Sequence, residues 1–130
     1  MKGEIMTEKH RIKPLVLIVE YDRTEQDALR SMIEKHCDVI MASSPLDALS
    51  RYSSSCPNIV FLDIELPNGE GETLIEDLKK LDPDSYIVML SNCISRHYIK
   101  KCTRNGAEGL LTKPANEEGL LQYINNYNSK

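Results

Sequence analysis

The sequence lacks a long apolar stretch and an excess of positive charge. Its longest apolar run, Leu15–Val19, has five residues, whereas a helix that spans a bilayer needs about 20. The 16 Lys and Arg residues are outnumbered by 20 Asp and Glu residues, which gives a net charge of −4. A protein with this balance has no general attraction for nucleic acid or for an anionic membrane surface. We therefore expect no direct contact with membranes or nucleic acid.

Signals for export and for cysteine cross-links are also missing. Residues 1–13 are charged and contain no apolar core of a signal peptide, so the expected location is the cytoplasm. No two cysteines form a C-x-x-C pair, and no His lies beside them at zinc-finger spacing. We therefore interpret them as reduced thiols in or near the core rather than as disulfides or metal ligands. They are Cys37, Cys56, Cys93 and Cys102.

What the sequence does contain fits one globular domain. Its 130 residues, of which 41% are hydrophobic and 28% charged, are enough to bury a single core without disulfides. We find no internal repeat, low-complexity tract or linker that would separate a second domain. The predicted division is a flexible N-terminal tail over residues 1–13 and one domain over residues 14–130.

Five short apolar runs, bounded by turn-forming residues, alternate with segments of helical periodicity. Each run is too short for a buried helix and indicates a strand buried on both faces. The runs are Leu15–Val19, Val39–Ala42, Ile59–Leu62, Ile87–Leu90 and Leu110–Leu111. Strict alternation of strand and helix predicts an α/β fold with one doubly wound parallel sheet, five helices on its two faces and right-handed crossovers.

Apolar stripes and capping residues place the helices between these strands. Ser44 precedes Pro45 and Asp47 in the order expected for a helix start, and Asn105-Gly106 suits a helix end. The stripes are Ala28, Leu29, Met32, Ile33 and His36, then Leu74, Leu78 and Leu81, then Ile94, Tyr98 and Cys102, and finally Leu120, Ile124 and Tyr127.

Acidic, hydroxyl and basic side chains stand where the predicted strands end. Glu20 and Asp22 follow the first run, and Asp63 follows the third. Ser91 follows the fourth run, and Lys113 comes shortly after the fifth. Ligands of an open parallel sheet bind at this edge, and carboxylates brought close together need a cation or a shared proton. Hard oxygen ligands beside a lysine indicate Mg²⁺ and a phosphoryl group.

The order of these motifs resembles the receiver domain of two-component response regulators, over residues 15–127. The matching motifs are Leu17-Ile18-Val19-Glu20, Phe61-Leu62-Asp63 leading into Leu66-Pro67-x-Gly69-x-Gly71, Val88-Met89-Leu90-Ser91, and Leu111-Thr112-Lys113-Pro114. Each motif is weak alone, but the set in this order is highly specific. The resemblance implies a flavodoxin-like sheet with strand order 2-1-3-4-5.

The resemblance also implies a role for each matching residue. Asp63 is expected to be the phosphoacceptor, a carboxylate nucleophile that forms an aspartyl phosphate. Ser91 is expected to hydrogen-bond the phosphoryl oxygens, and Lys113 to pair first with the acceptor carboxylate and then with the phosphoryl group. Mg²⁺ would be held by Glu20, Asp63 and the backbone carbonyl of Glu65. The peptide bond between Lys113 and its proline is cis in most receivers.

Some of these residues also have ordinary structural interpretations. Asp22 is either an additional candidate metal ligand or the N-cap of a capping box with Glu25. Ser91 is either the phosphoryl-binding hydroxyl or a strand-end serine bonded to nearby backbone. Gly69 and Gly71 are turn residues under either interpretation.

Three residues around the predicted site depart from the family pattern. Receivers usually present two adjacent acids after the first strand, but here Tyr21 follows, and a neutral phenol is a poor Mg²⁺ ligand. Asn92 replaces a small residue after the hydroxyl, and Leu110 replaces an aromatic side chain that often changes rotamer. We therefore expect weak Mg²⁺ binding and weakened phosphorylation, with the side chains of Asp22 and Glu65 as candidate substitutes for the lost ligand.

The predicted function is a stand-alone response-regulator module that accepts a phosphoryl group on Asp63. The donor would be a sensor histidine kinase or a phosphotransfer protein, and the signal would pass to a downstream protein target. We expect no enzymatic activity beyond its own phosphorylation and dephosphorylation. The alternative is a pseudo-receiver, an interaction module that works without phosphorylation, and Tyr21 is the residue that separates the two.

Two further interpretations concern catalysis and partners. A phosphatase of the haloacid dehalogenase type, suggested by Asp63-Ile64-Glu65, is disfavoured because that family places its nucleophile on the first strand and normally needs a longer chain with a cap. Lys100, Lys101 and Arg104 make the fourth predicted helix basic. This predicts either a surface on that helix and its neighbours for an acidic partner or a solvated helix face.

Overall fold

The computed structural model describes residues 9–67, 70–92 and 95–128, and within them five strands alternate with five helices. The strands are β1 (Leu15–Val19), β2 (Asp38–Ala42), β3 (Ile59–Asp63), β4 (Ile87–Ser91) and β5 (Gly109–Thr112). The helices are α2 (Arg23–Ile33), α3 (Pro45–Ser55), α4 (Glu70–Leu81), α5 (Arg96–Arg104) and α6 (Glu117–Asn128).

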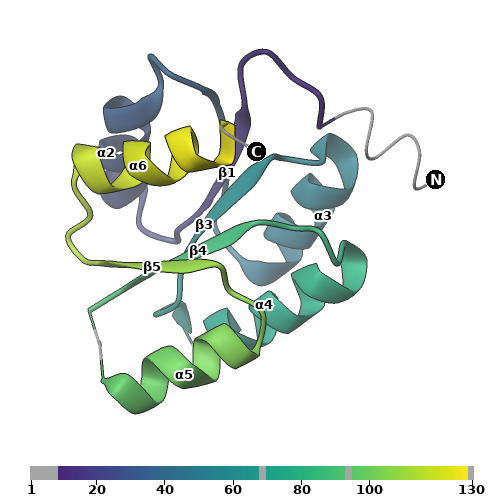
Figure 1. Cartoon of the computed structure of the whole chain (residues 1–130), viewed down its shortest axis with the longest axis vertical. Helices are drawn as coiled ribbons and strands as arrows, with labels where there is room; N and C mark the ends of the chain where they lie inside the picture. The colour runs from purple at the N-terminus through teal and green to yellow at the C-terminus, as the bar shows by residue number, and fades with distance from the viewer. Residues whose placement is uncertain (1–8, 68–69, 93–94, 129–130) are drawn as a thin grey trace.

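All five strands are parallel and lie in the order β2-β1-β3-β4-β5, which confirms the predicted sheet. Helices α2 and α6 cover one face, and α3, α4 and α5 cover the other (Figure 1). In the register of the sheet, Asp63 pairs with Leu90 and Ser91 pairs with Thr112. The predicted site residues therefore gather at the carboxyl edge of the strands.

Burial differs between the central and the outer strands. Strands β3 and β4 are buried along their whole length, and β1 is buried at four of its five positions. Strands β2 and β5 are mostly half-buried, so the prediction that every strand is buried on both faces is wrong for these two. The reason is that an edge strand has a neighbour on one side only.

The helices also differ from the predicted apolar stripes at their ends. Helix α2 ends at Ile33, so His36 lies beyond it and is exposed. Leu81, the last residue of α4, is 43% exposed. Among the other predicted positions, Gly69, Cys93 and Ile94 lie outside the described residues.

Gly71 is a helical residue rather than the predicted turn residue. It lies in the first turn of α4 and is buried. A Cβ atom at this position would lie 2.3 Å from the carbonyl oxygen of Ile64, closer than any real contact. Glycine is therefore required because the start of α4 touches the backbone directly after β3.

The N-caps predicted at Asp22 and Ser44 are confirmed. Asp22 caps α2, since its Oδ1 accepts the backbone N–H of Thr24 at 2.8 Å. Ser44 Oγ accepts the N–H of Asp47 at 3.1 Å at the start of α3. These short polar side chains satisfy N–H groups that have no partner within the helix.

Residues before β1 contact the end of α3 and the residue that follows α4. Lys9 Nζ donates to Tyr52 Oη at 3.1 Å and pairs with Asp82. Arg11 donates to the backbone carbonyls of Ser55 at 2.7 Å and Cys56 at 2.9 Å. The mobility predicted for residues 1–13 stays a prediction, but Lys9 and Arg11 have defined partners.

The described cysteines lie in the core, as predicted. Cys37, Cys56 and Cys102 are buried, and no disulfide joins them. No helix within the described ranges is long and apolar enough to cross a membrane.

Candidate functional site

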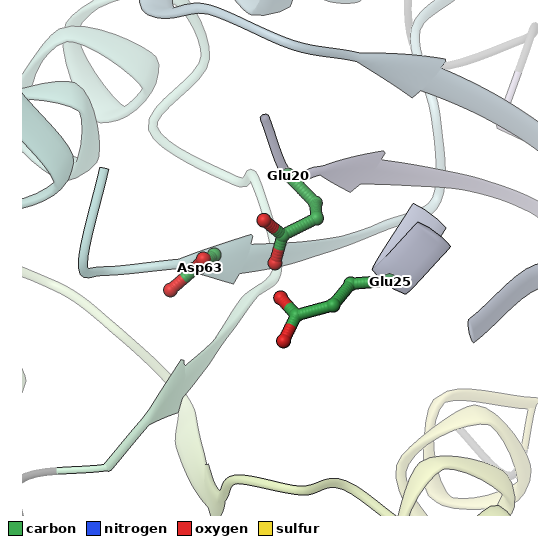
Figure 2. A group of neighbouring side chains, drawn as sticks. All are labelled: Glu20, Glu25 and Asp63. Carbon is green, nitrogen blue, oxygen red and sulfur yellow. The ribbon is translucent and has the colours of Figure 1, made fainter. Parts of the chain in front are cut away.

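Three carboxylates from different elements converge at the carboxyl edge of the sheet. Glu20 directly follows β1, Glu25 lies in the first turn of α2, and Asp63 ends β3. One oxygen from each lies within 4.8 Å of the others. Figure 2 shows the three side chains directed into a shared space. Glu20 and Asp63 are buried, whereas the Glu25 side chain is 47% exposed and opens the cluster to solvent.

Glu20 has one satisfied and one unsatisfied oxygen. Its Oε2 accepts the backbone N–H of Asp22 at 3.0 Å, whereas Oε1 is buried and has no hydrogen-bond partner among the described residues. Burial, together with the neighbouring carboxyl groups of Asp63 and Glu25, raises the pKa of Glu20 to about 8. A buried oxygen aimed at other carboxylates is the kind of group that a bound cation or a shared proton would satisfy.

Lys113 supplies positive charge to the same site. Its Nζ lies 3.1 Å from Asp63 Oδ2 and 3.7 Å from Glu25 Oε2. Burial alone would lower the pKa of Lys113, but the hydrogen bond to Asp63 and the nearby carboxylates outweigh it and raise that pKa. Lys113 therefore stays protonated next to Asp63. The peptide bond that follows it is cis.

Glu65 and Ser91 form a second polar group beside Asp63. The backbone N–H of Glu65 donates to Asp63 Oδ1 at 3.0 Å. The Glu65 carboxylate accepts hydrogen bonds from Ser91 Oγ at 3.3 Å and from the backbone N–H of Asn92 at 3.0 Å. Ser91 is thus held by a side chain, and its hydroxyl is directed toward the segment that follows Asp63.

Most of the predicted site residues lie together, but Asp22 lies apart from them. Asp63, Lys113, Glu65 and Ser91 are brought together with Glu20, as expected. Asp22 is exposed, and its Oδ1 accepts the N–H of Thr24, so it serves as an N-cap and lies outside the carboxylate cluster. Tyr21 is 55% exposed.

Glu25 is the residue of the site that sequence reasoning missed. It was assigned to a capping box, in which its carboxylate would accept the N–H of Asp22. That N–H donates to Glu20 instead, and Glu25 turns toward Asp63. An acid in the first turn of the helix that follows the first strand was the signal available in the sequence.

An apolar cleft of about 100 Å³ adjoins the carboxylates. Glu20, Glu25 and Lys113 line part of it, and Leu29 and Met32 of α2 are among its apolar lining residues. The polar site is therefore bordered by a surface that can hold an apolar side chain.

Comparisons with known proteins place this geometry in a family. The profile of the response regulator receiver domain matches residues 16–125. Protein PilH of Pseudomonas aeruginosa is 33% identical over 113 residues, which cover 85% of this chain and 93% of PilH. Chemotaxis protein CheY of Halobacterium salinarum is 26% identical over 110 residues, which cover 84% of this chain and 92% of CheY.

Solved structures show the same fold. A two-component response regulator from Clostridium difficile superposes with a TM-score of 0.84 at 23% identity, covering 91% of this chain and 98% of that one. The beryllofluoride-activated DrrB receiver domain superposes with a TM-score of 0.82 at 20% identity, covering 92% of this chain and 100% of that one.

Family membership carries general properties. Receiver domains typically bind Mg²⁺, work with a two-component partner kinase and are not catalytic enzymes apart from the phosphorylation chemistry on their own chain. The phosphatase interpretation is therefore dropped. By its sheet, its site and its match over residues 16–125, the chain belongs to the response regulator receiver domain family.

Proposed function

We propose that this domain accepts a phosphoryl group on Asp63 and passes the signal on through protein contacts. The observation that carries the proposal is the convergence of Glu20, Glu25 and Asp63, with Lys113 bonded to Asp63. One buried oxygen of Glu20 has no hydrogen-bond partner in the part of the chain that the structure describes. Such an arrangement supports cation binding and phosphoryl transfer at the same carboxylate. The expected location is the cytoplasm, as is typical of the family.

The residues fit a bound Mg²⁺, which prefers oxygen ligands and a carboxylate set of this kind. Glu20, Glu25 and Asp63 would hold it through their side chains, and Glu65 through its backbone carbonyl. The metal would neutralise negative charge on the transferred group. Glu25 restores the carboxylate that Tyr21 fails to supply, so the weak Mg²⁺ binding expected from Tyr21 is offset in this proposal.

The phosphoryl donor is a phosphohistidine of a sensor kinase or a phosphotransfer protein. Asp63 attacks the phosphorus atom, the O–P bond forms, and the P–N bond to the histidine breaks. The bond electrons leave on the histidine nitrogen, which keeps its ring neutral by taking a proton from solvent. Lys113 stays beside the developing charge, and Ser91 offers its hydroxyl to a phosphoryl oxygen.

The downstream partner is proposed to bind helix α5. His97, Lys100, Lys101 and Arg104 lie along one face of this helix. Lys101 also pairs with Glu72 of α4 at 3.0 Å, so Lys100 and Arg104 are the stronger candidates for an acidic partner surface.

A phosphorylation-independent pseudo-receiver is the second candidate. It is favoured by one observation, the exposed phenol of Tyr21 in place of an acid next to Glu20. The two candidates differ in whether Asp63 is modified at all.

Phosphorylation of Asp63 is tested with acetyl phosphate and Mg²⁺, by mass spectrometry of the intact protein. One added phosphoryl group is expected in the wild type and in Asp22→Asn, a matched control in which the altered acid only caps a helix. Asp63→Asn should add none. Labelling that survives in Asp63→Asn would refute the assignment, and no labelling of the wild type would favour the pseudo-receiver.

A further inference from the structure

The Glu65 carboxylate accepts hydrogen bonds from a set of donors at the end of β4. Its Oε2 accepts from the backbone N–H of Asn92 at 3.0 Å and from Ser91 Oγ at 3.3 Å. Its Oε1 accepts from Asn92 Nδ2 at 3.1 Å and lies 3.6 Å from Lys113 Nζ. One side chain after β3 therefore bridges to the end of β4 and to the lysine that follows β5.

One of these donors, Lys113, also contacts Asp63, the residue that would carry the phosphoryl group. Lys113 Nζ bonds to Asp63 Oδ2, and the Glu65 backbone N–H bonds to Asp63 Oδ1. The Glu65 carboxylate, two residues along the chain, thus lies 3.6 Å from the same lysine that bonds to Asp63 Oδ2. An acyl phosphate brings about two negative charges to this place, and like charges repel strongly in a partly buried site.

We propose that Glu65 is a positioning residue that holds the donors of Ser91 and Asn92 and must release them before Asp63 accepts a phosphoryl group. This inference rests on the proposed phosphorylation of Asp63. In the unmodified protein the carboxylate satisfies the donors. The carboxylate first turns outward, and after transfer the phosphoryl oxygens take over the same hydrogen bonds.

The surroundings of Glu65 permit this exchange. Its side chain is 35% exposed, so it can rotate into solvent without leaving a buried charge unpaired. Asn92 is exposed as well, and its side-chain amide adds a bond to Glu65 that a small residue could not make. The unusual residue at position 92 therefore has a structural role, which is to strengthen the hold on Glu65.

The proposal predicts faster phosphorylation when the carboxylate is removed. Initial rates with acetyl phosphate and Mg²⁺ are compared for the wild type, Glu65→Ala and Glu65→Gln. Glu76→Gln is the matched control, because it removes the same charge from an exposed position on α4. We expect Glu65→Ala to react about tenfold faster, in line with the loss of a charge-assisted hydrogen-bonded competitor. The initial rate of Glu65→Gln should lie between those of the wild type and Glu65→Ala, and the rate of Glu76→Gln should match the wild type.

A second measurement reports on the hydrogen bond between Asn92 and Glu65 itself. The backbone amide of Asn92 gives one resonance in a nitrogen-15 correlation spectrum, and its position depends on the acceptor of that N–H. In Glu65→Ala, without any phosphodonor, this resonance should shift while the resonances of α2 stay in place. A change limited to general stability would not produce this pattern.

Three outcomes would overturn the proposal. Equal or slower labelling of Glu65→Ala with normal labelling of Asp63 would remove the role of Glu65 and leave the phosphoacceptor assignment intact. An unshifted Asn92 amide would show that the contact is not made in solution. No labelling in any of these proteins would overturn both the role of Glu65 and the phosphorylation of Asp63.

Discussion

Lys113 and Asp63 form an ion pair at 3.1 Å in which the Asp63 side chain is 1% exposed and the Lys113 side chain 16%. The pair is therefore shielded from solvent on the Asp63 side. Glu20 and Glu25 lie next to it, so one ammonium group serves several carboxylates at once. Any cation that enters the cluster has to share these carboxylates with Lys113.

Replacing Lys113 by methionine is expected to change metal binding and phosphorylation in opposite directions. Without the ammonium group, the carboxylates should bind Mg²⁺ roughly tenfold more tightly, because a like charge has been removed from the site. Phosphorylation should become slower, because the developing charge on the transferred group loses its partner. Calorimetry measures the first effect and intact-mass kinetics the second. Lys100→Met, an exposed change on α5, should alter Mg²⁺ affinity little, and weaker Mg²⁺ binding by Lys113→Met would contradict the arrangement.

Glu25 is expected to contribute to Mg²⁺ affinity, whereas Asp22 is not. Glu25→Gln should weaken binding by about tenfold to a hundredfold, the size of one lost charge-assisted contact of about 1.5–3 kcal/mol. Asp22→Asn keeps an N-cap and should leave the affinity almost unchanged. Tyr21→Asp, introduced into Glu25→Gln, should restore it. Equal affinities of Glu25→Gln and the wild type would show that Tyr21 has not been compensated by Glu25.

Mg²⁺ binding is expected to release a proton near neutral pH. The pKa of Glu20 is raised to about 8 by burial and by its carboxyl neighbours, so the metal-free protein holds a proton there at pH 7. Mg²⁺ displaces it, and the affinity should rise by up to about tenfold per pH unit below pH 8 and level off above. Calorimetry in two buffers with different ionisation enthalpies counts the proton. No proton uptake by either buffer at pH 7 would contradict the raised pKa.

The raised pKa of Glu20 also predicts how the stability of the metal-free protein depends on pH. A carboxyl group whose pKa is higher in the folded than in the unfolded state binds more protons when folded. The free energy of unfolding should therefore fall as the pH rises from the ordinary carboxyl pKa of 4.5 toward 8. Glu20→Gln should flatten this part of the profile in urea titrations.

Gly71→Ala is expected to destabilise the domain. The added Cβ would lie 2.3 Å from the Ile64 carbonyl oxygen, and the strain should cost on the order of 1–3 kcal/mol of unfolding free energy. Gly119→Ala in α6 is the control, because the nearest atom to its Cβ is the end of the Leu111 side chain at 3.0 Å. Urea unfolding followed by circular dichroism compares the two, and equal midpoints would argue against the close contact of α4.

The sequence patterns predicted the sheet because buried parallel strands leave a simple signal. Leu15–Val19 and Ile87–Leu90 are continuous apolar runs that match β1 and most of β4. Asp63 and Lys113 were predicted as site residues because the ends of parallel strands meet at one edge. For these residues, position along the chain is enough to determine position in space.

Glu25 and the side chain of Glu65 could not be placed in the same way. Each lies on a segment after a strand, where the direction of the side chain depends on competing hydrogen bonds. The Glu25 side chain is free to turn toward Asp63 because the N–H of Asp22 donates to Glu20 instead. The direction of the Glu65 side chain follows from the donors of Asn92, which comes directly after β4. This is a long-range partner that no local pattern reveals.

The contacts of Lys9 and Arg11 have a practical consequence for handling the protein. They fasten the start of the described chain to the amino-terminal edge of the sheet, and Asn58 Nδ2 donates to Tyr127 Oη at 3.3 Å near the other end. Asp63 lies at the opposite edge, about 16 Å away along a five-residue strand. A dye or a surface attachment placed beside Lys9 or Tyr127 therefore lies at the edge away from Asp63 and leaves the reactive edge open to a phosphodonor.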